Sequence, residues 1–339
     1  MNADLHASIT RIAQLADRPY DLESLPHDEW ETGDYVCARV RRRPGSDVRV
    51  ENPSGRYVEL LEGETLIGAL GTRRATRGLV GDWRDIGEDG HMHVLTGGGV
   101  LGRVTSASPF AESPIAVEYE GHVTLGEDVA RMRDFRIESA GAALETPVVV
   151  VFGTSMSAGK TISGRVITRV LVDAGYDVAA TKLTGAGTWK DVLSMQVAGA
   201  DPIYDFVDAG LPTTVVPEST YREAIRGLIG RIEDDDPDVL VVEIGASPLE
   251  PYNGEAAVDL LADQVEFTVL CATDPYAVVG IELAFGTSPD VVAGIATNTT
   301  AGVDLVEELT ECRALNLQRE DAKDPLREQL LDALSERLD

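Results

Sequence analysis

The stretch Val148-Val-Val-Val-Phe-Gly-Thr-Ser-Met-Ser-Ala-Gly-Lys-Thr161 decides the fold of the C-terminal half of this chain. Its four valines and phenylalanine predict a strand that is buried on both faces of a sheet. A glycine-bounded turn follows at 153–159, and the residues after it have the apolar spacing of a helix. Strand, glycine-rich turn and helix together predict a phosphate-binding loop, because backbone N–H groups and the helix dipole both favour an anion there.

Two residues at the end of this loop have side chains suited to a nucleotide. Lys160 would reach the terminal phosphates, and the hydroxyl of Thr161 would bind Mg²⁺. We expect the other nucleotide contacts from the rest of the loop, which consists of Gly153, Thr154, Ser155, Met156, Ser157, Ala158 and Gly159. The alternative is a glycine turn that precedes Lys-Thr by chance, and the flanking strand and helix argue against it.

The sequence around this loop alternates between strands and helices. Continuous apolar strands with helices between them imply a mainly parallel sheet covered by helices, which is an α/β fold. The last 20 residues should form a charged helix. We predict strands at 147–152, 177–182, 239–244, 267–272 and 291–297, and helices at 161–174, 190–198 and 221–233.

The N-terminal part has a different pattern. Apolar positions at helical spacing predict a helix within residues 1–25. Short alternating runs between 33 and 137, separated by Gly, Pro, Asp and Asn, predict a β-rich domain, either a small barrel or a sandwich. With a linker at 138–145, we expect an N-terminal helix and β-rich domain at 1–145 and a nucleotide-binding α/β domain at 146–339. The predicted strands of the first domain are 35–40, 57–61, 91–95 and 115–119.

The charge of the chain restricts its partners. The 339 residues include 58 acidic and 29 basic side chains, for a net charge of −29. Such a surface repels nucleic acid and anionic membranes, so we expect neither as a partner. The substrate should be a small molecule, and a homodimer or larger homo-oligomer stays open. Few lysines among many acids resemble the composition of halophilic archaeal proteins; an acidic mesophilic protein is the alternative.

Other features of composition favour the cytoplasm. No apolar run is long enough for a membrane span, and no secretory signal is visible at the N-terminus. Cys37, Cys271 and Cys312 are too far apart for a metal knuckle and too few for a disulfide framework.

The loop has five residues between Gly153 and the Gly159-Lys160 pair, one more than the usual motif. In this it resembles the loop of dethiobiotin synthetase, within the P-loop NTPase class that contains the cobyrinate amidases and the Min/Par ATPases. The resemblance covers roughly 150–300 and implies ATP and Mg²⁺ as ligands. It also implies that Lys182, at the end of the second strand, binds substrate and phosphate. The lysine count supports attention to this region, because three of the four lysines lie at Lys160, Lys182 and Lys190.

The same resemblance assigns three further residues. Asp191 would be a metal ligand that opens a helix, although an acid that only favours the helix dipole is the alternative. Glu243 would be the second acidic metal ligand, because a lone carboxylate in an apolar strand needs a cation. Asn298 would contact the nucleotide base, although asparagine is also common in plain turns.

A second similarity complicates the assignment of a reaction. The segments Lys182-Leu-Thr-Gly185 and Asp205-Phe-Val-Asp-Ala-Gly-Leu-Pro212 look like those of a largely uncharacterised P-loop family, some of whose members are linked to D-glutamate N-acylation. The first acid of the second segment, Asp205, lies in a loop-like stretch together with Asp208. Solvated loop acids are the commoner outcome there, and part of a metal or substrate site is the alternative.

Our first hypothesis is therefore an ATP-dependent enzyme, similar to a ligase or phosphotransferase, that activates a carboxylate or carbamate. Lys160 and Lys182 would be its catalytic cations. The alternatives are a nucleotide-dependent switch or accessory ATPase, and an acyltransferase whose loop binds CoA. The switch usually has an additional lysine early in the loop, where this chain has Ser155 and Met156.

Overall fold

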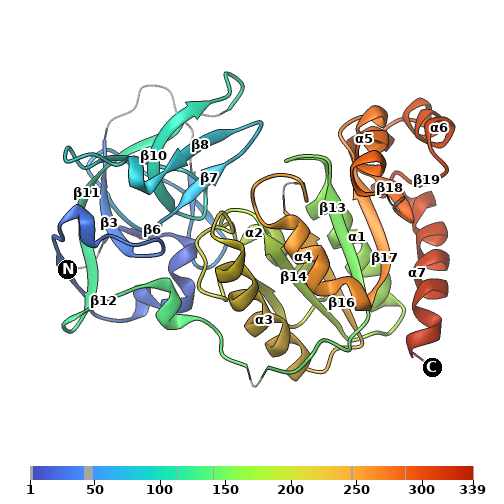
Figure 1. The fold of residues 1–339 in the computed structure, drawn as a ribbon, viewed down its shortest axis with the longest axis horizontal. Helices are drawn as coiled ribbons and strands as arrows, with labels where there is room; N and C mark the ends of the chain where they lie inside the picture. Colours follow the sequence, from blue (N-terminus) through green and yellow to red (C-terminus); the bar gives the residue numbers. More distant parts are fainter. Residues whose placement is uncertain are drawn as a thin grey trace. The chain divides into compact units, whose positions relative to one another are not determined.

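The computed structural model describes residues 3–41, 49–111, 113–139, 141–245, 247–286 and 288–338 (Figure 1). The chain divides into two compact units, each of which is described by itself. The β unit comprises Met1–Glu138, Gly185–Lys190 and Phe206–Ala224, and the α/β unit comprises Ser139–Thr184, Asp191–Asp205 and Ile225–Asp339. The domain boundaries expected from the sequence stay a prediction.

One fully parallel sheet forms the centre of the α/β unit. Its strands lie in the order β15-β14-β16-β13-β17-β18-β19. The apolar runs form these strands because both faces of the sheet are buried, as the fully buried β16 shows. The strands are β13 (Val148–Gly153), β14 (Val178–Thr184), β15 (Ile203–Asp205), β16 (Val239–Ile244), β17 (Val265–Cys271), β18 (Val291–Ala293) and β19 (Arg313–Ala314).

Helices cover this sheet, as the sequence predicts. Helices α1 and α7 contact each other and the sheet, and α4 contacts β14. Figure 1 shows α4 lying across the near face of the strands. The helices are α1 (Lys160–Asp173), α2 (Lys190–Ala198), α3 (Glu218–Asp234), α4 (Gly254–Leu261), α5 (Pro275–Phe285), α6 (Thr300–Leu309) and α7 (Lys323–Leu338).

The strand order fixes where a ligand can bind. Strand β13 lies between β16 and β17, whereas β14, the next strand in the chain, lies on the other side of β16. The chain therefore leaves β13 in one direction and later returns to build β17 and β18 on its opposite side. In open α/β sheets, ligands bind outside the carboxyl ends of the strands at such a switch point. The loop 154–159 begins at this position.

One predicted strand of this sheet is too long. The apolar run suggested 291–297, but β18 ends at Ala293. Gly294 has a φ of 87°, and Ile295–Thr297 form a 3₁₀ turn. Within this turn Ala296 and Thr297 are buried and Ile295 is 46% exposed, so the apolar run continues past the last residue of the strand and could not mark its end.

Antiparallel strands dominate the β unit. Five strands of this unit form a closed ring, which corresponds to the small barrel among the two predicted alternatives. The ring closes through the pairings β6–β3, β3–β11, β11–β9, β9–β10 and β10–β6. Shorter strands and 3₁₀ turns surround this ring. The ring consists of β3 (Tyr35–Val40), β6 (Thr65–Leu70), β9 (His91–Val94), β10 (Val100–Ala107) and β11 (Ile115–Leu125). Further strands of this unit are β4 (Arg49–Glu51), β5 (Tyr57–Glu59), β7 (Thr72–Arg74), β8 (Leu79–Asp82) and β12 (Asp128–Val129).

The helix predicted within residues 1–25 is wrong. The described part of this segment forms strands β1 (Leu5–His6) and β2 (Asp21–Glu23), with 3₁₀ turns at Ser8–Ala13 and Leu15–Asp17. Leu5 pairs with a strand of the barrel, and Gln14 has a φ of 50°, which stops a helix. The apolar spacing marked buried residues correctly, since Ile9 and Leu15 are both 1% exposed, but tertiary pairing decided the backbone.

No helix in the part of the chain that the structure describes combines the length and the apolar character needed to cross a membrane.

Candidate nucleotide and metal site

The turn between β13 and α1 has the backbone of a tight loop. Ser157 has a φ of 59° and Gly159 a φ of 113°, so the chain reverses in the left-handed region before α1 begins. The N–H of Thr154 donates to the carbonyl of Cys271 at 3.0 Å, and the hydroxyl of Thr154 accepts the N–H of Thr273 at 3.1 Å. These bonds attach the start of the loop to the end of β17. Among the predicted loop contacts, Gly153, Ser155 and Ala158 are buried, Thr154, Met156 and Gly159 are half-buried, and Ser157 is exposed.

Lys160 folds back over the end of β13. A Cβ atom on Gly153 would lie 3.0–3.1 Å from Cδ, Cγ and Nζ of Lys160, so glycine leaves the space that the lysine occupies. The ammonium donates to the carbonyl of Ser155 at 2.9 Å, and the residue is 6% exposed. Burial lowers the pKa of Lys160, and the carboxylate of Glu243 partly opposes this effect. A buried cation therefore lies inside the loop where we expect phosphate.

A hydroxyl and two carboxylates meet at the N-terminus of α1. The Thr161 hydroxyl lies 3.1 Å from Glu243 Oε2 and 3.3 Å from Asp191 Oδ1. Asp191 lies in the first turn of α2, as predicted, and Glu243 on β16 is 2% exposed. Burial raises the pKa of Glu243, the Asp191 carboxylate raises it further, and Lys182 and Lys160 oppose the rise. The structure thus brings together all three residues that we predicted as metal ligands.

Lys182 completes this cluster from β14. It is in register with Glu243 on β16, so the two side chains share one face of the sheet. Its ammonium donates to Asp191 Oδ2 at 2.5 Å, and the residue is 7% exposed. A Cβ on Gly245 would lie 2.0 Å from the carbonyl oxygen of Thr184 and 3.1 Å from Cε of Lys182, so glycine allows the close approach of the Thr184 backbone and also leaves room for the lysine. Burial alone would lower the pKa of Lys182, but attraction to Asp191 and Glu243 outweighs burial, and the pKa lies above its ordinary value.

Asp205 is a buried residue that sequence reasoning placed among solvated loop acids. It ends strand β15, is 0% exposed and is in register with Lys182. A strand of three residues gives no readable alternation, so only the pairing with β14 reveals its place. Asp208, its predicted loop companion, differs: it pairs with Arg11 at 2.7 Å within the β unit.

Asn298 is exposed and follows the 3₁₀ turn Ile295–Thr297, which comes after β18. This segment packs against the phosphate loop through its first residues. The N–H of Ile295 donates to the carbonyl of Ala158 at 3.2 Å, and a Cβ on Gly294 would lie 2.1 Å from the same oxygen. The structure therefore places the segment beside the loop, and contact between Asn298 and a base stays a prediction.

The residues of the cluster fit Mg²⁺ with a nucleotide phosphate. Oxygen ligands from one hydroxyl and two carboxylates are those that Mg²⁺ prefers, with phosphate and water at its other positions. Among the residues that the structure describes, no group of three or more His, Cys, Asp or Glu side chains is arranged to hold a metal ion. Lys160 and Lys182 supply the positive charge that phosphates need.

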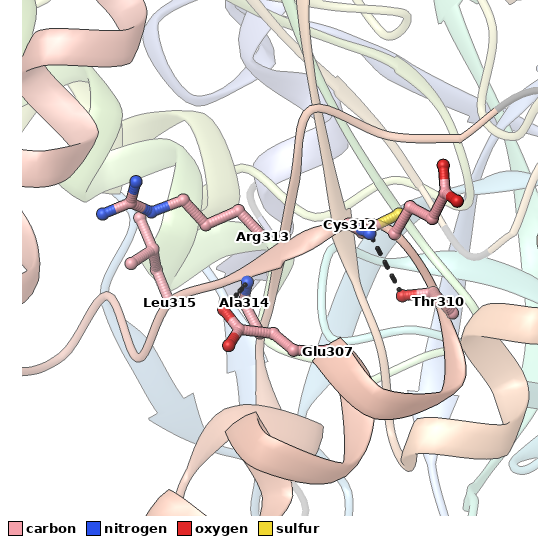
Figure 2. A pocket seen from close by; sticks show the side chains of 7 residues that line it. Glu307, Thr310, Cys312, Arg313, Ala314 and Leu315 are labelled. Atoms are coloured by element: carbon pink, nitrogen blue, oxygen red, sulfur yellow. Dashed lines mark hydrogen bonds between the residues drawn. The ribbon is translucent and has the colours of Figure 1, made fainter.

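A separate cavity of about 490 Å³ lies where α6 leads into β19. Figure 2 shows two hydrogen bonds among its lining residues, from the Ala314 N–H to Glu307 at 3.2 Å and from the Cys312 N–H to the Thr310 hydroxyl at 3.3 Å. None of the residues that line it belongs to the set predicted from the sequence. The lining residues are Glu307, Thr310, Glu311, Cys312, Arg313, Ala314 and Leu315.

No protein-family model matches this chain, and no curated protein matches its sequence. Its structure is similar to that of the signal recognition particle receptor FtsY from Elizabethkingia anophelis, with 14% identity and a TM-score of 0.37, over 58% of this chain and 68% of that one. The hydrogenase maturation factor HypB from Archaeoglobus fulgidus matches with 14% identity and a TM-score of 0.38, over 56% and 90% of the two chains. A DUF1611 family protein from Anabaena variabilis matches with 19% identity and a TM-score of 0.38, over 59% and 60%.

Proposed function

We propose that this chain is an enzyme that binds a nucleotide with Mg²⁺ and activates a small-molecule carboxylate or carbamate by phosphoryl transfer. One observation carries the proposal: two buried lysines and two carboxylates converge beside a phosphate-type loop at the carboxyl edge of a parallel sheet. A site that only binds a nucleotide needs Lys160. A second buried cation, Lys182, adds the means to stabilise charge on a phosphoryl group in transit.

Each residue has a role in this reaction. Lys160 and the N–H groups of the loop would bind the nucleotide phosphates, while Thr161, Asp191 and Glu243 would hold Mg²⁺. Bound Mg²⁺ neutralises phosphate charge. A substrate oxygen would attack the terminal phosphorus, the bond to the bridging oxygen would break, and the nucleoside diphosphate would leave. Lys182 would stabilise the charge that develops on the transferred group.

The nature of the nucleotide and substrate rests on the resemblance of the loop to dethiobiotin synthetase, which favours ATP. The net charge of −29 supports a small-molecule partner rather than nucleic acid or a membrane surface. A cytoplasmic location is part of the same proposal, and a homo-oligomer stays open. A nucleotide-dependent switch and a CoA-binding acyltransferase are outcomes that the following experiment separates from phosphoryl transfer.

The experiment compares thermal shifts and turnover for ATP, GTP and CoA, with and without Mg²⁺, in the parent and in Lys182→Ala. A specific ligand at about 100 times its dissociation constant should stabilise the protein by roughly 2.7 kcal/mol. Lys182→Ala should keep nucleotide affinity within a few-fold and reduce nucleotide turnover about 100-fold. Equal turnover in parent and variant would favour the switch, and stabilisation by CoA alone would favour the acyltransferase.

A further inference from the structure

We infer that Asp205 is a positioning residue for Lys182: it supplies the buried counter-charge that keeps this lysine in place when Asp191 turns to the metal. The inference deepens the proposed function and rests on it, because it concerns the same site. It gives a role to an acid that sequence patterns place in solvent.

Three charged residues form a row across neighbouring strands. Asp205 on β15 is in register with Lys182 on β14, which is in register with Glu243 on β16. Adjacent strands lie about 4.8 Å apart, and residues in register on parallel strands share a face of the sheet. The three residues are 0%, 7% and 2% exposed, respectively. Lys182 therefore lies between two buried acids within the sheet itself.

Asp191 reaches the same lysine from outside the row. Its carboxylate accepts a hydrogen bond from Lys182 at 2.5 Å and lies 3.3 Å from the Thr161 hydroxyl. One carboxylate thus contacts both the second cation and a proposed metal ligand. An ammonium group and a metal ion repel each other and compete for the same oxygens. When the Asp191 carboxylate binds a metal ion, the Lys182 ammonium needs another negatively charged partner, because a buried charge without a partner costs folding free energy.

The strand order shows which acid can take that place. The charged groups that face Lys182 are Asp191 from α2, Glu243 from β16, Asp205 from β15 and, as a like charge, Lys160 from α1. Glu243 also contacts the Thr161 hydroxyl and so belongs with the metal ligands. β15 lies on the other side of β14 from β16. Asp205 can therefore act as the counter-charge of Lys182 while the other two acids hold the metal.

The test is an isothermal titration of the full chain with ATP, once with EDTA and once over a series of Mg²⁺ concentrations. In Asp205→Asn, Lys182 would depend more strongly on Asp191, and this carboxylate would be less available to bind Mg²⁺. The Mg²⁺ concentration that gives half of the maximal ATP affinity should therefore rise about fivefold or more. ATP affinity in EDTA should stay the same or increase, because a negative charge near the phosphates is removed. A merely structural role would weaken binding in both conditions, and that result would overturn the inference.

Asp235→Asn is the matched control. The Asp235 carboxylate accepts a hydrogen bond at 2.7 Å from Tyr204, the neighbour of Asp205 in β15. Successive residues in a strand face opposite sides of the sheet, so this change disturbs the same strand without touching the charged row. Both ATP titrations should be unchanged.

A double-mutant cycle shows whether Asp205 acts through the lysine. In a Lys182→Met background, Asp205→Asn should leave the half-maximal Mg²⁺ concentration unchanged. A fivefold rise in that background would overturn the inference, because Asp205 would then affect the metal without Lys182.

A crystal structure of nucleotide-free Asp191→Asn decides the question even if the parent binds neither ATP nor GTP. Absence of nucleotide binding would refute the proposed function by itself. In the Asp191→Asn structure, Lys182 Nζ should lie within hydrogen-bonding distance of the Asp205 carboxylate. A Lys182 that turns away from Asp205, into solvent or toward Glu243 alone, would overturn the inference.

Discussion

Replacement of Lys182 by methionine tests the charges of the site without any ligand. Methionine keeps much of the length of the side chain and removes the charge. The parent pairs Lys182 with Asp191 at 2.5 Å, and the two side chains are only 8% and 14% exposed, so solvent screens the pair little. Removal of one partner of a buried pair costs about 3–5 kcal/mol, because the other charge is left without compensation. We expect Lys182→Met to lose stability in this range at neutral pH.

Circular dichroism of the helices is the natural assay, because the helical residues lie mostly in the α/β unit. For a domain of this size, about 1 kcal/mol lowers the midpoint of thermal unfolding by about 2–4 °C. The helical transition of Lys182→Met should therefore fall by about 6–20 °C.

The pH dependence of this loss has a definite sign. In the folded protein the pKa of Glu243 lies above its ordinary value, because of burial and of Asp191. The stability that this group contributes is present at low pH and is lost as pH rises through the folded-state pKa. Without Lys182 the pKa of Glu243 rises further, so the destabilisation should be larger near neutral pH than near about pH 5.

A double variant provides the control. In Lys182→Met/Asp191→Asn both members of the pair are neutral, and removal of both is less costly than removal of one. The double variant should be more stable than Lys182→Met. The reasoning is refuted if Lys182→Met unfolds at the parent temperature at neutral pH, or if the double variant is no more stable than the single one.

Three further changes test other parts of the site. In Gly153→Ala the new Cβ would lie 3.0–3.1 Å from the Lys160 side chain, so the lysine must move. ATP affinity, measured by titration calorimetry, should therefore fall about tenfold, or about 1.4 kcal/mol. An affinity equal to that of the parent would contradict this packing. Glu243→Gln should raise the half-maximal Mg²⁺ concentration more than it changes ATP affinity in EDTA, and an unchanged Mg²⁺ series would remove Glu243 from the metal ligands. In Gly294→Ala the new Cβ would lie 2.1 Å from the Ala158 carbonyl oxygen, at a residue whose φ is 87°. Both the unfolding temperature and the ATP affinity should therefore decrease. If the variant keeps both, the phosphate loop does not depend on this contact.

The sequence predicts those parts of the fold that local patterns determine. Continuous apolar runs mark the central strands, and β16 has the predicted bounds of 239–244. The loop could be found from Gly153, Gly159 and Lys160 because each has a direct physical task there: room for the lysine, a left-handed turn and a cation. Lys182 and Glu243 could also be predicted as site residues, because they lie near the carboxyl ends of such strands and ligands bind at that edge of the sheet.

Other features depend on contacts between distant segments, which local patterns do not report. Leu5 and His6 pair with strand β6, so the helical spacing around Ile9 and Leu15 predicted burial correctly but the backbone wrongly. The local sequence predicts Asp205 as a loop acid, and only the pairing of β15 with β14 shows that it lies in the sheet. The ion pair between Lys182 and Asp191 likewise appears only when α2 and β14 are placed in one unit.

The most direct test of the central claim is a calorimetric titration of the parent and of Lys160→Ala with ATP, in the presence and absence of Mg²⁺. The parent should bind ATP saturably and more tightly with Mg²⁺, because the loop, Lys160 and the oxygen ligands around Thr161 act on the same phosphates. Lys160→Ala should stay folded and lose this binding. If Lys160→Ala binds ATP with Mg²⁺ as tightly as the parent, the loop at 153–161 is not the nucleotide site.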